Sequence, residues 1–489
     1  MRLAPKLSPL PPRTPASENA GTLKNIRKLI WVYFFLLIFE GTFRKWIVPQ
    51  LSDVLLIIRD PVVIVIYILA QKAKVFPRNG YIFTLAVISF LSCLVSLLVL
   101  QPYLSLQPLV LVTGYGFRSN FLHLPLIFVM GKVMDEEDVK KLGWWVLVGL
   151  IPMCALLAVQ FSSAPDAFVN RTAGLGETQQ ITAGGGKIRP AGTFSFVSGI
   201  VFYAALSAAY LLYASLSRGL YRNWVLYTAG LALVVTIGVS GSRSVLLAVL
   251  VVLSTLLALL LFRPSAMNQF ARNLLIVVVV LLVATRLPFV NEGVEVLSDR
   301  FTTVAEAEQT TIAGGLIART FNSYTEGILL VTRAPIGGYG LGIGTNGGAK
   351  FLTGRSLFLL AEGEWGRVIL ESGPILGLAF LTWRTMLMLK IGLISFRKLK
   401  QGNILPIMLF AAGFLPLLNG QFGQPTTLGF AIFLCGLCLA ATNRKMGSLE
   451  LAPNGSEGSL PPRVARRSRY AEQLHSIRGP RHPDDFVNR

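Results

Sequence analysis

Apolar residues run along this chain in long segments that short polar connections separate. A helix needs about 20 apolar residues to cross the hydrocarbon core of a bilayer, and twelve segments approach that length. They are residues 29–43, 52–71, 81–101, 104–131, 143–161, 193–217, 223–240, 244–262, 270–288, 365–389, 404–420 and 427–442. The pattern predicts an all-α, polytopic integral membrane protein of about 12 transmembrane helices.

Two of these predicted spans depart from a simple apolar helix. Residues 29–43 form a short span that ends in FEGTFRKW, and basic residues stand where a signal peptide would have small ones, so we expect this span to remain as an anchor. Residues 104–131 contain Tyr115, Arg118 and His123. Because irregular backbone at membrane depth must be shielded from lipid, these polar groups predict a broken or re-entrant segment.

The connections define the predicted domain organisation. Residues 1–28 form a cytoplasmic N-terminal segment, and residues 443–489, rich in Pro, Arg, Ser and Gly, read as a disordered basic cytoplasmic tail. The transmembrane domain, residues 29–442, has two long connections: 162–192, and the large loop 289–363 between predicted helices 9 and 10. We expect both to lie outside the cytoplasm.

The larger loop contains a helical pattern followed by a glycine-rich turn. Apolar side chains recur at helical spacing, at Ile317, Phe321, Tyr324, Ile328 and Val331. The pattern predicts an amphipathic helix that lies against the membrane domain and ends at Pro335. The following APIGGYGLGIGTNGG is interpreted either as a flexible turn or as backbone that must approach a bulky ligand closely, which glycine permits.

Composition and charge agree with a membrane protein. Of 489 residues, 53% are hydrophobic and only 14% are charged, and the mean hydropathy is +0.61, well above the range of soluble domains. The net charge of +21 is better explained by orientation and anionic partners than by nucleic acid. With the N-terminus in the cytoplasm, 29 of 45 Lys and Arg fall inside and 11 outside, which predicts that both termini are cytoplasmic.

Metal and disulfide chemistry are disfavoured. The four cysteines all lie in apolar segments, and the pair in FLCGLC, Cys435 and Cys438, lacks nearby ligands that would complete a metal site. Only three histidines are present. We therefore expect no metal and no other cofactor.

Charged residues within the predicted spans form two close sets. Glu40 and Arg44 are four residues apart, and Arg59 is followed by Asp60. Intramembrane charges tend either to pair or to face a cavity. We expect pairing between the first two spans, with a cavity-facing role as the alternative.

Arginines on the predicted outer side are candidates for a phosphate site. They run against the positive-inside rule, and the planar guanidinium suits phosphate. They are Arg171, Arg189, Arg243, Arg300, Arg319, Arg333 and Arg355. The alternative for each is solvated surface or lipid-headgroup contact.

The segment LAEGEWGRVILESGPILG contains the carboxylates that are candidates for catalysis. Glu364, Arg367 and Glu371, spaced three and four apart, share one helical face and are expected to pair. Glu362 falls off this face. Glu362 and Glu364 are the candidate catalytic residues, and Glu362 is the one left over for chemistry.

These features together resemble the O-antigen ligase and O-antigen polymerase superfamily. The likeness rests on the topology, on GSRS before the eighth span, on RAPIGGYGLGIG in the large loop and on ESGPILGLAF in the next helix. It covers roughly residues 190–390. It implies transfer of a glycan from a polyprenyl-pyrophosphate carrier to an acceptor sugar at the outer face of a bacterial inner membrane, without a nucleotide sugar.

The resemblance also implies roles for residues. Outer-loop arginines, here Arg171, Arg189, Arg243, Arg319 and Arg333, would bind the pyrophosphate. Ligases of the superfamily carry a histidine eleven residues before the glycine of the Glu-x-Gly motif; that position is Glu362 here, counted from Gly373. A carboxylate in place of histidine favours a polysaccharide polymerase acting with other assembly proteins over an O-antigen ligase that uses lipid A core. A non-enzymatic polysaccharide transporter or export component is the alternative from another class.

Overall fold

The computed structural model of this chain is mostly helical. The residues that it describes are 15–173, 182–184, 187–217, 219–262, 291–293, 295, 312–355 and 358–443. The predicted C-terminal tail and the predicted span 270–288 lie outside the described residues.

The described part of the first half of the chain contains nine helices of α or π type, together with two short 3-10 turns. In order they are α1 (Pro15–Thr42), η1 (Phe43–Ile47), η2 (Pro49–Leu51), α2 (Ser52–Leu55), α3 (Arg59–Lys72), α4 (Gly80–Leu100), α5 (Leu106–Phe117), η3 (Arg118–Leu122), α6 (Pro125–Val133), α7 (Glu136–Ser162) and η4 (Phe168–Asn170). A small antiparallel pair follows, β1 (Thr182–Gly184) with β2 (Lys187–Ile188).

The second half is built in the same way. Its elements are α8 (Ser198–Leu216), α9 (Asn223–Val239), α10 (Arg243–Phe262), α13 (Ile312–Val331), α14 (Asn346–Thr353), α15 (Glu364–Lys400), α16 (Leu405–Asn419) and α17 (Pro425–Ala440). Five of the described helices, α4, α7, α8, α10 and α15, are long and apolar enough to cross a membrane, and α9, α16 and α17 are shorter apolar helices. The full number of spans remains a prediction.

The predicted break in residues 104–131 is confirmed. This segment consists of α5, the π-helical η3 and α6, and Arg118 opens the π-helical turn. Residues 52–71, predicted as one span, are also interrupted, because the helix stops at Leu55 and resumes at Arg59. Both interruptions carry buried charged side chains. Charged groups at membrane depth are costly and usually mark a functional region.

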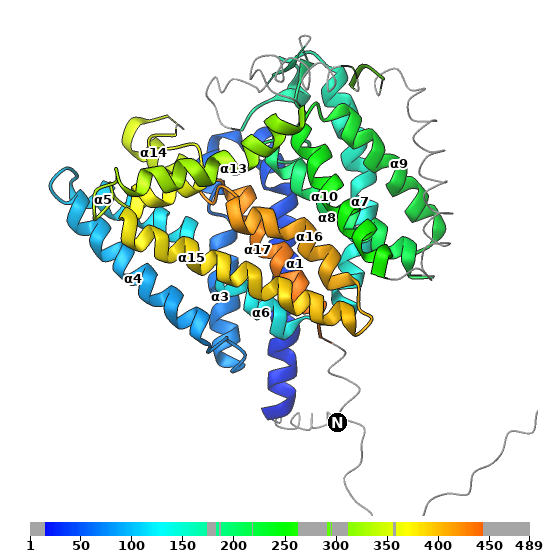
Figure 1. Ribbon diagram of the computed structural model, residues 1–489, viewed down its shortest axis with the longest axis horizontal. Coiled ribbons are helices and arrows are strands. Elements are labelled where there is room, and N and C mark those ends of the chain that lie inside the picture. The colour runs from blue at the N-terminus through cyan, green and yellow to red at the C-terminus, as the bar shows by residue number, and fades with distance from the viewer. Residues whose placement is uncertain are drawn as a thin grey trace, which may run out of the picture. The chain divides into compact units, whose positions relative to one another are not determined.

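The helices pack into one core. In Figure 1, α15 runs diagonally with α4 on one side and α16 on the other, and both helices contact it. The apolar α17 packs against α16, α6 and α8, and α10 packs against α8. Nearly every side chain of α17 is buried, so this helix lies at the centre of the bundle.

Connections that were predicted on the same side of the membrane meet in the structure. On the side assigned to the cytoplasm, Arg27 before the first span pairs with Asp138 at 3.2 Å. On the opposite side, Lys45 after that span donates a hydrogen bond to the Gly192 carbonyl, in the first long connection. The alternation of ends agrees with the charge pattern, and the assignment of one end to the cytoplasm stays a prediction.

The amphipathic helix predicted in the large loop is present as α13, which packs along α15. It ends at Val331, earlier than the predicted end at Pro335. Tyr324 contacts Trp365 of α15, with ring centroids 4.9 Å apart. Ile328, a member of the predicted stripe, is 59% exposed, so the buried face is rotated slightly away from the one that the apolar spacing indicated.

The glycine-rich turn is tightly packed, which contradicts its interpretation as a flexible turn. Gly340 N–H donates to the Glu371 carbonyl at 3.1 Å, and the N–H of Tyr339 donates to the Leu370 carbonyl at 2.8 Å. Gly342 has φ +97°, and a Cβ there would overlap the Val112 carbonyl of α5. Glycine is required because the turn lies directly against the backbones of two helices.

Candidate active site

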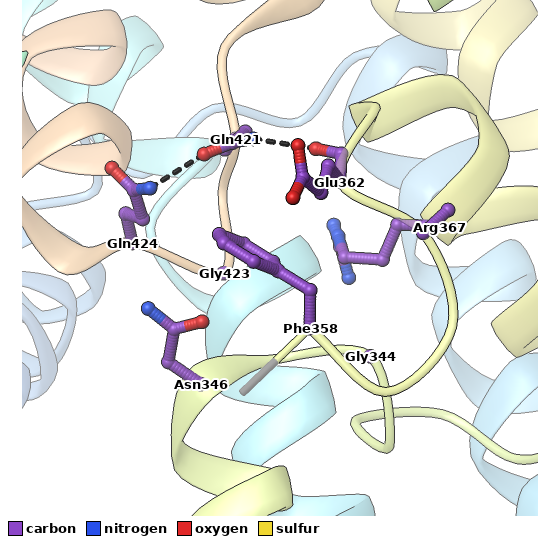
Figure 2. A pocket seen from close by; sticks show the side chains of 9 residues that line it. Gly344, Asn346, Phe358, Glu362, Arg367, Gln421, Gly423 and Gln424 are labelled. Carbon is purple, nitrogen blue, oxygen red and sulfur yellow. Dashed lines mark hydrogen bonds between the residues drawn. The ribbon is translucent and has the colours of Figure 1, made fainter. Parts of the chain in front are cut away.

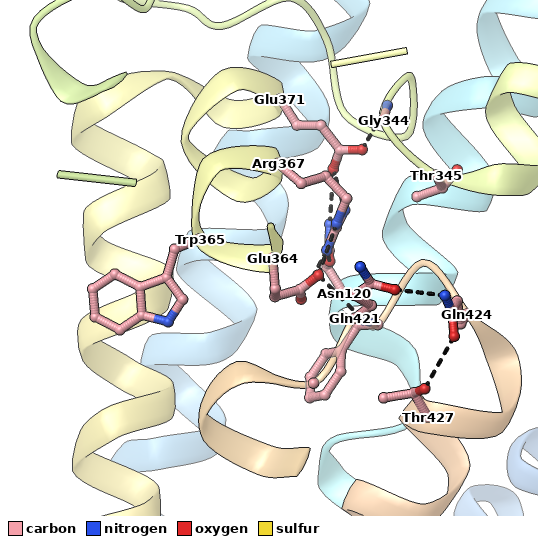
Figure 3. A network of polar contacts seen from close by, with 12 residues as sticks. Asn120, Gly344, Thr345, Glu364, Trp365, Arg367, Glu371, Gln421, Gln424 and Thr427 are labelled. Carbon is pink, nitrogen blue, oxygen red and sulfur yellow. Dashed lines mark hydrogen bonds and ion pairs between the residues drawn. The ribbon is translucent and has the colours of Figure 1, made fainter. Parts of the chain in front are cut away.

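The ion stripe predicted at the start of α15 forms as expected (Figure 3). Arg367 Nε lies 2.9 Å from Glu364 Oε2, and Arg367 Nη1 lies 2.6 Å from Glu371 Oε2. All three side chains are buried. Residues three and four apart on a helix are neighbours, so the local spacing alone was sufficient to bring this triad together.

Two residues that the sequence did not associate with the stripe complete it. Arg384 lies 20 residues after Glu364 in α15 and places Nη1 2.6 Å from Glu364 Oε1, which is possible because α15 is broken at Gly373, where φ is 75° and ψ is 170°. Asn120 of η3 accepts a hydrogen bond from Arg367 Nη2 at 2.8 Å. Two carboxylates therefore balance two guanidinium groups, which is the condition under which buried charges are tolerated.

Glu364 has no free acceptor for chemistry in this arrangement. Its Oε1 accepts from Arg384 and from Arg367 Nη2, and its Oε2 accepts from Arg367 Nε and from the N–H of Phe422 at 3.2 Å. It is 1% exposed. Of the two candidate catalytic carboxylates, the geometry assigns Glu364 to the buried network that fixes the start of α15.

Glu362 has the opposite surroundings (Figure 2). It precedes α15, it is exposed, and no ion pair involves its carboxylate among the described residues. It lines a small pocket of about 10 Å³ together with Asn346, Phe358, Gln421 and Gln424. Gln421 Nε2 donates to the Glu362 backbone carbonyl and so fixes the chain there, while the carboxylate stays unengaged.

A larger cavity of about 340 Å³ adjoins this pocket. The two share Asn346, Phe358 and Gln424 as lining residues. Four basic side chains line the larger cavity, Arg44, Lys45, Arg171 and Arg189, and none of its lining residues is acidic. We refer to it as the cationic cavity. A space of this size suits a small-molecule ligand, and its charge selects an anion.

Polar groups in the cationic cavity are left without partners. The buried hydroxyl of Tyr115 and Nε of Arg189 have no hydrogen-bond partner among the residues that the structure describes. Buried polar groups are normally satisfied. Both side chains line the cavity, so a bound anion with several acceptor oxygens would satisfy Arg189 and Tyr115 together.

The basic side chains differ in how they are held. Arg44 pairs with Glu40 at 3.5 Å and donates to Ser195 Oγ at 2.9 Å. Arg171 is exposed and stacks over Phe168, 5.3 Å from the ring centroid. Burial lowers the pKa of Lys45 to about 7. The cavity thus carries both fixed positive charge and one amine that titrates near neutrality.

The first long connection is fixed by side chains that bind its backbone. Gly192, at φ +61°, donates its N–H to Gln160 Oε1 at 2.8 Å, and its carbonyl accepts from Lys45. Near the other end, Asn170 Nδ2 donates to the Gln160 carbonyl of α7 at 3.1 Å. Both ends of the connection are therefore anchored to α7 and η1, which positions Arg171 and Arg189 at the cavity wall.

The intramembrane charges pair between the first two spans, as expected. Glu40 of α1 lies 3.2 Å from Arg59 of α3 through Oε2 and Nε, and 3.5 Å from Arg44. Asp60 does not pair with its neighbour Arg59 but with Arg118, at 2.6 Å. Arg44 connects this set of charges to the cationic cavity, since it pairs with Glu40 and also lines the cavity.

The predicted phosphate-binding arginines do not all meet. Arg171 and Arg189 line the cationic cavity. Arg243 opens α10 and lines neither cavity, and Arg333 is exposed in the turn after α13, beyond the helix on which it was expected to align with Arg319. The side chain of Arg319 lies outside the described residues, as does Arg300, and the exposed Arg355 lines neither cavity.

Sequence reasoning gave Arg44 a cavity-facing role only as the alternative to pairing, and it missed Lys45 as a member of the site, although a signal was present. They follow the first span on the predicted outer side, where basic residues run against the orientation rule. The same signal had pointed to Arg171 and Arg189. The polar side chains Tyr115, Asn346 and Gln424 were missed because nothing in their local sequence indicates a cavity.

Among the described residues, no group of three or more His, Cys, Asp or Glu side chains is placed to hold a metal ion. The four cysteines are free thiols, and Cys435 and Cys438 are buried in α17. Cys438 lies 3.0 Å from Ser395 Oγ. This pair packs between helices, in agreement with its interpretation from the sequence.

No protein-family model matches this chain, and no curated protein is significantly similar to it in sequence. A function for the chain therefore rests on the geometry of the site and on the motifs that resemble a known superfamily.

Proposed function

We propose that this protein is a membrane glycosyltransferase that moves a glycan from a polyprenyl-pyrophosphate carrier to the hydroxyl of an acceptor sugar. The observation that carries the proposal is the position of Glu362. An exposed carboxylate without an ion-pair partner lies in a pocket that shares three lining residues with the cationic cavity. Base and anion site are thus adjacent but separate, as transfer from a diphosphate requires.

The chemistry balances with these groups alone. The acceptor oxygen attacks the anomeric carbon, the bond from that carbon to the phosphate oxygen breaks, and the electron pair leaves on the diphosphate. Arg171, Arg189 and Arg44 are placed to stabilise the charge that develops on this leaving group. Glu362 accepts the proton of the attacking hydroxyl. The buried network of α15 acts indirectly, because it holds the backbone from which Glu362 projects.

We further propose that the acceptor is another lipid-linked repeat unit, so that the reaction polymerises an exopolysaccharide or O-antigen. The support is the carboxylate at the position where ligases of the superfamily carry histidine. Several apolar helices are compatible with a membrane protein. On this proposal the chain is a multi-pass protein of a bacterial inner membrane with both termini cytoplasmic and Glu362 at the outer side, alongside other polysaccharide assembly proteins.

The test is transfer by purified full-length protein in lipid nanodiscs, supplied with lipid-linked repeat units extracted from the producing bacterium. Glu362→Gln should lower the rate on the order of 100-fold or more, as expected for loss of a general base, without loss of folded protein. Glu326→Gln is the matched control: Glu326 is an exposed carboxylate of α13 close to Gly363, and its exchange should leave transfer near the wild-type rate.

The two variants also separate the alternatives. If Glu326→Gln is inactive and Glu362→Gln is active, then Glu326 of α13 is the general base in place of Glu362. Wild-type protein that binds lipid-linked units but forms no longer product would refute the enzyme and favour a binding or export component.

A further inference from the structure

Lys45 is a buried amine for which the described residues provide no counter-ion. Its side chain is 3% exposed, on η1, at the wall of the cationic cavity. Its Nζ donates to the Gly192 carbonyl and lies 4.4 Å from the ring centroid of Trp46. Among the described residues, no carboxylate pairs with it. Burying an ammonium without a paired charge is unfavourable, so Lys45 favours its neutral amine form when no anion is bound.

The neighbouring elements offer Lys45 no spare negative charge. On α1, Glu40 is engaged by Arg44 and Arg59. Asp53 of α2 is engaged by Lys350 at 2.5 Å. In the described part of the connection 162–192, the one acidic residue, Asp166, is exposed and does not line the cavity, and the basic residues are Arg171, Lys187 and Arg189. Lys187 is paired with Glu292 at 3.1 Å. The part of α7 that meets this connection presents the neutral Gln160.

We infer that Lys45 is a diphosphate-binding residue that acquires its positive charge when the anion enters the cationic cavity. This inference deepens the proposed function, on which it rests for the identity of the anion. Lys45 lines the cationic cavity, and a bound anion would provide the negative charge that the described residues do not give it. An anion held by Arg171 and Arg189 brings that charge to the wall where Lys45 lies, and the protein takes up as much as one proton, on Lys45, for each anion bound.

The direction of the pH dependence follows from linkage. Burial holds the pKa of Lys45 at about 7 in the empty protein, and a bound anion raises it, because it favours the ammonium form. Affinity is therefore greatest below pH 7. As the pH rises above 7, binding must include the cost of protonating Lys45, so affinity falls by up to about tenfold per pH unit.

The experiment is a binding titration of full-length protein in nanodiscs. The probe is the dimethyl diester of diphosphoric acid, with one methyl on each phosphate, because it has the two negative charges of the carrier diphosphate and no ionisation near neutrality. Its dissociation constant is measured calorimetrically from about pH 6 to about pH 8.5, in two buffers whose ionisation enthalpies differ, which also counts the protons taken up.

Wild-type protein should lose affinity about tenfold per pH unit above pH 7, with proton uptake near neutrality. Lys45→Arg, whose guanidinium stays charged, should bind with an affinity that changes by less than about twofold over the range and without proton uptake. Lys72→Met removes an exposed lysine of α3 that does not line the cavity and should keep the wild-type slope.

A wild-type slope in Lys45→Arg would overturn the inference, as would a flat profile in the wild type. Because the readout is binding, these outcomes are independent of transfer: loss of the slope with normal transfer refutes the role of Lys45 alone. Absence of any binding of the diester to wild-type protein refutes the anion site itself.

Discussion

Glu364→Gln is the substitution for which the structure gives the largest expected loss of stability. The exchange keeps the size of the side chain and removes its charge. Arg367 and Arg384, buried at 3% and 0% exposure, then have only Glu371 as a neighbouring carboxylate in the network, and Glu371 pairs with Arg367 alone. The network changes from electrically neutral to a net charge of +1 among buried side chains.

The magnitude follows from the contacts that change. Glu364 accepts hydrogen bonds from both guanidinium groups, at 2.6 to 3.0 Å, and from one backbone N–H. Removing one partner of a buried ion pair costs about 3–5 kcal/mol, chiefly because the remaining charge is left uncompensated. We expect the free energy of unfolding to fall by that amount.

The assay is equilibrium unfolding of full-length protein in mixed micelles, with Glu362→Gln as the matched control. Glu362 undergoes the same chemical change two residues away, but it is exposed and unpaired, so its free energy of unfolding should stay within about 0.5 kcal/mol of the wild type. The double variant Glu364→Gln with Arg384→Met should recover most of the loss, because removing both partners restores neutrality. Equal stability of Glu364→Gln and Glu362→Gln would refute the reasoning.

Three further predictions concern topology, packing and anion recognition. A reporter active only in the cytoplasm should be silent when inserted after Gly354, a left-handed position with no neighbour within 4 Å of an added Cβ; strong activity would reverse the predicted orientation. Gly342→Ala, where a Cβ would overlap the Val112 carbonyl, should lower the unfolding free energy by about 1–3 kcal/mol, whereas Gly114→Ala within α5, with open space around it, should leave it unchanged or slightly higher. Arg189→Lys should weaken binding of the dimethyl diphosphate ester because lysine lacks the guanidinium fork, while Arg333→Lys, outside the cavity, should not; equal effects would place the anion elsewhere.

The sequence by itself determined the features that depend on neighbours along the chain. The apolar segment lengths located simple helices such as α4 and α10 to within one residue, since hydrogen bonding within a helix is a local requirement, but they did not give the ends of α1 and α15 or the interruption between Leu55 and Arg59. The triad Glu364, Arg367 and Glu371 followed from helical spacing. The break near Arg118 followed from polar residues in an apolar segment. The rotation of α13 was not foreseen, because Ile328 is exposed through the way α13 meets Trp365.

The tertiary structure alone decided which distant residues share a site. Lys45 and Gly192, 147 positions apart, are joined by a hydrogen bond, and Arg384 reaches Glu364, 20 residues earlier in α15, because the helix is broken at Gly373. Spacing along a chain fixes which face of a helix a side chain occupies, but the face that it meets depends on how whole helices pack. For that reason the positive-inside rule indicated which arginines lie on the predicted outer side, but it could not indicate which of them line the cavity. Packing brought Arg171 and Arg189 to the cavity and left Arg333 at the surface.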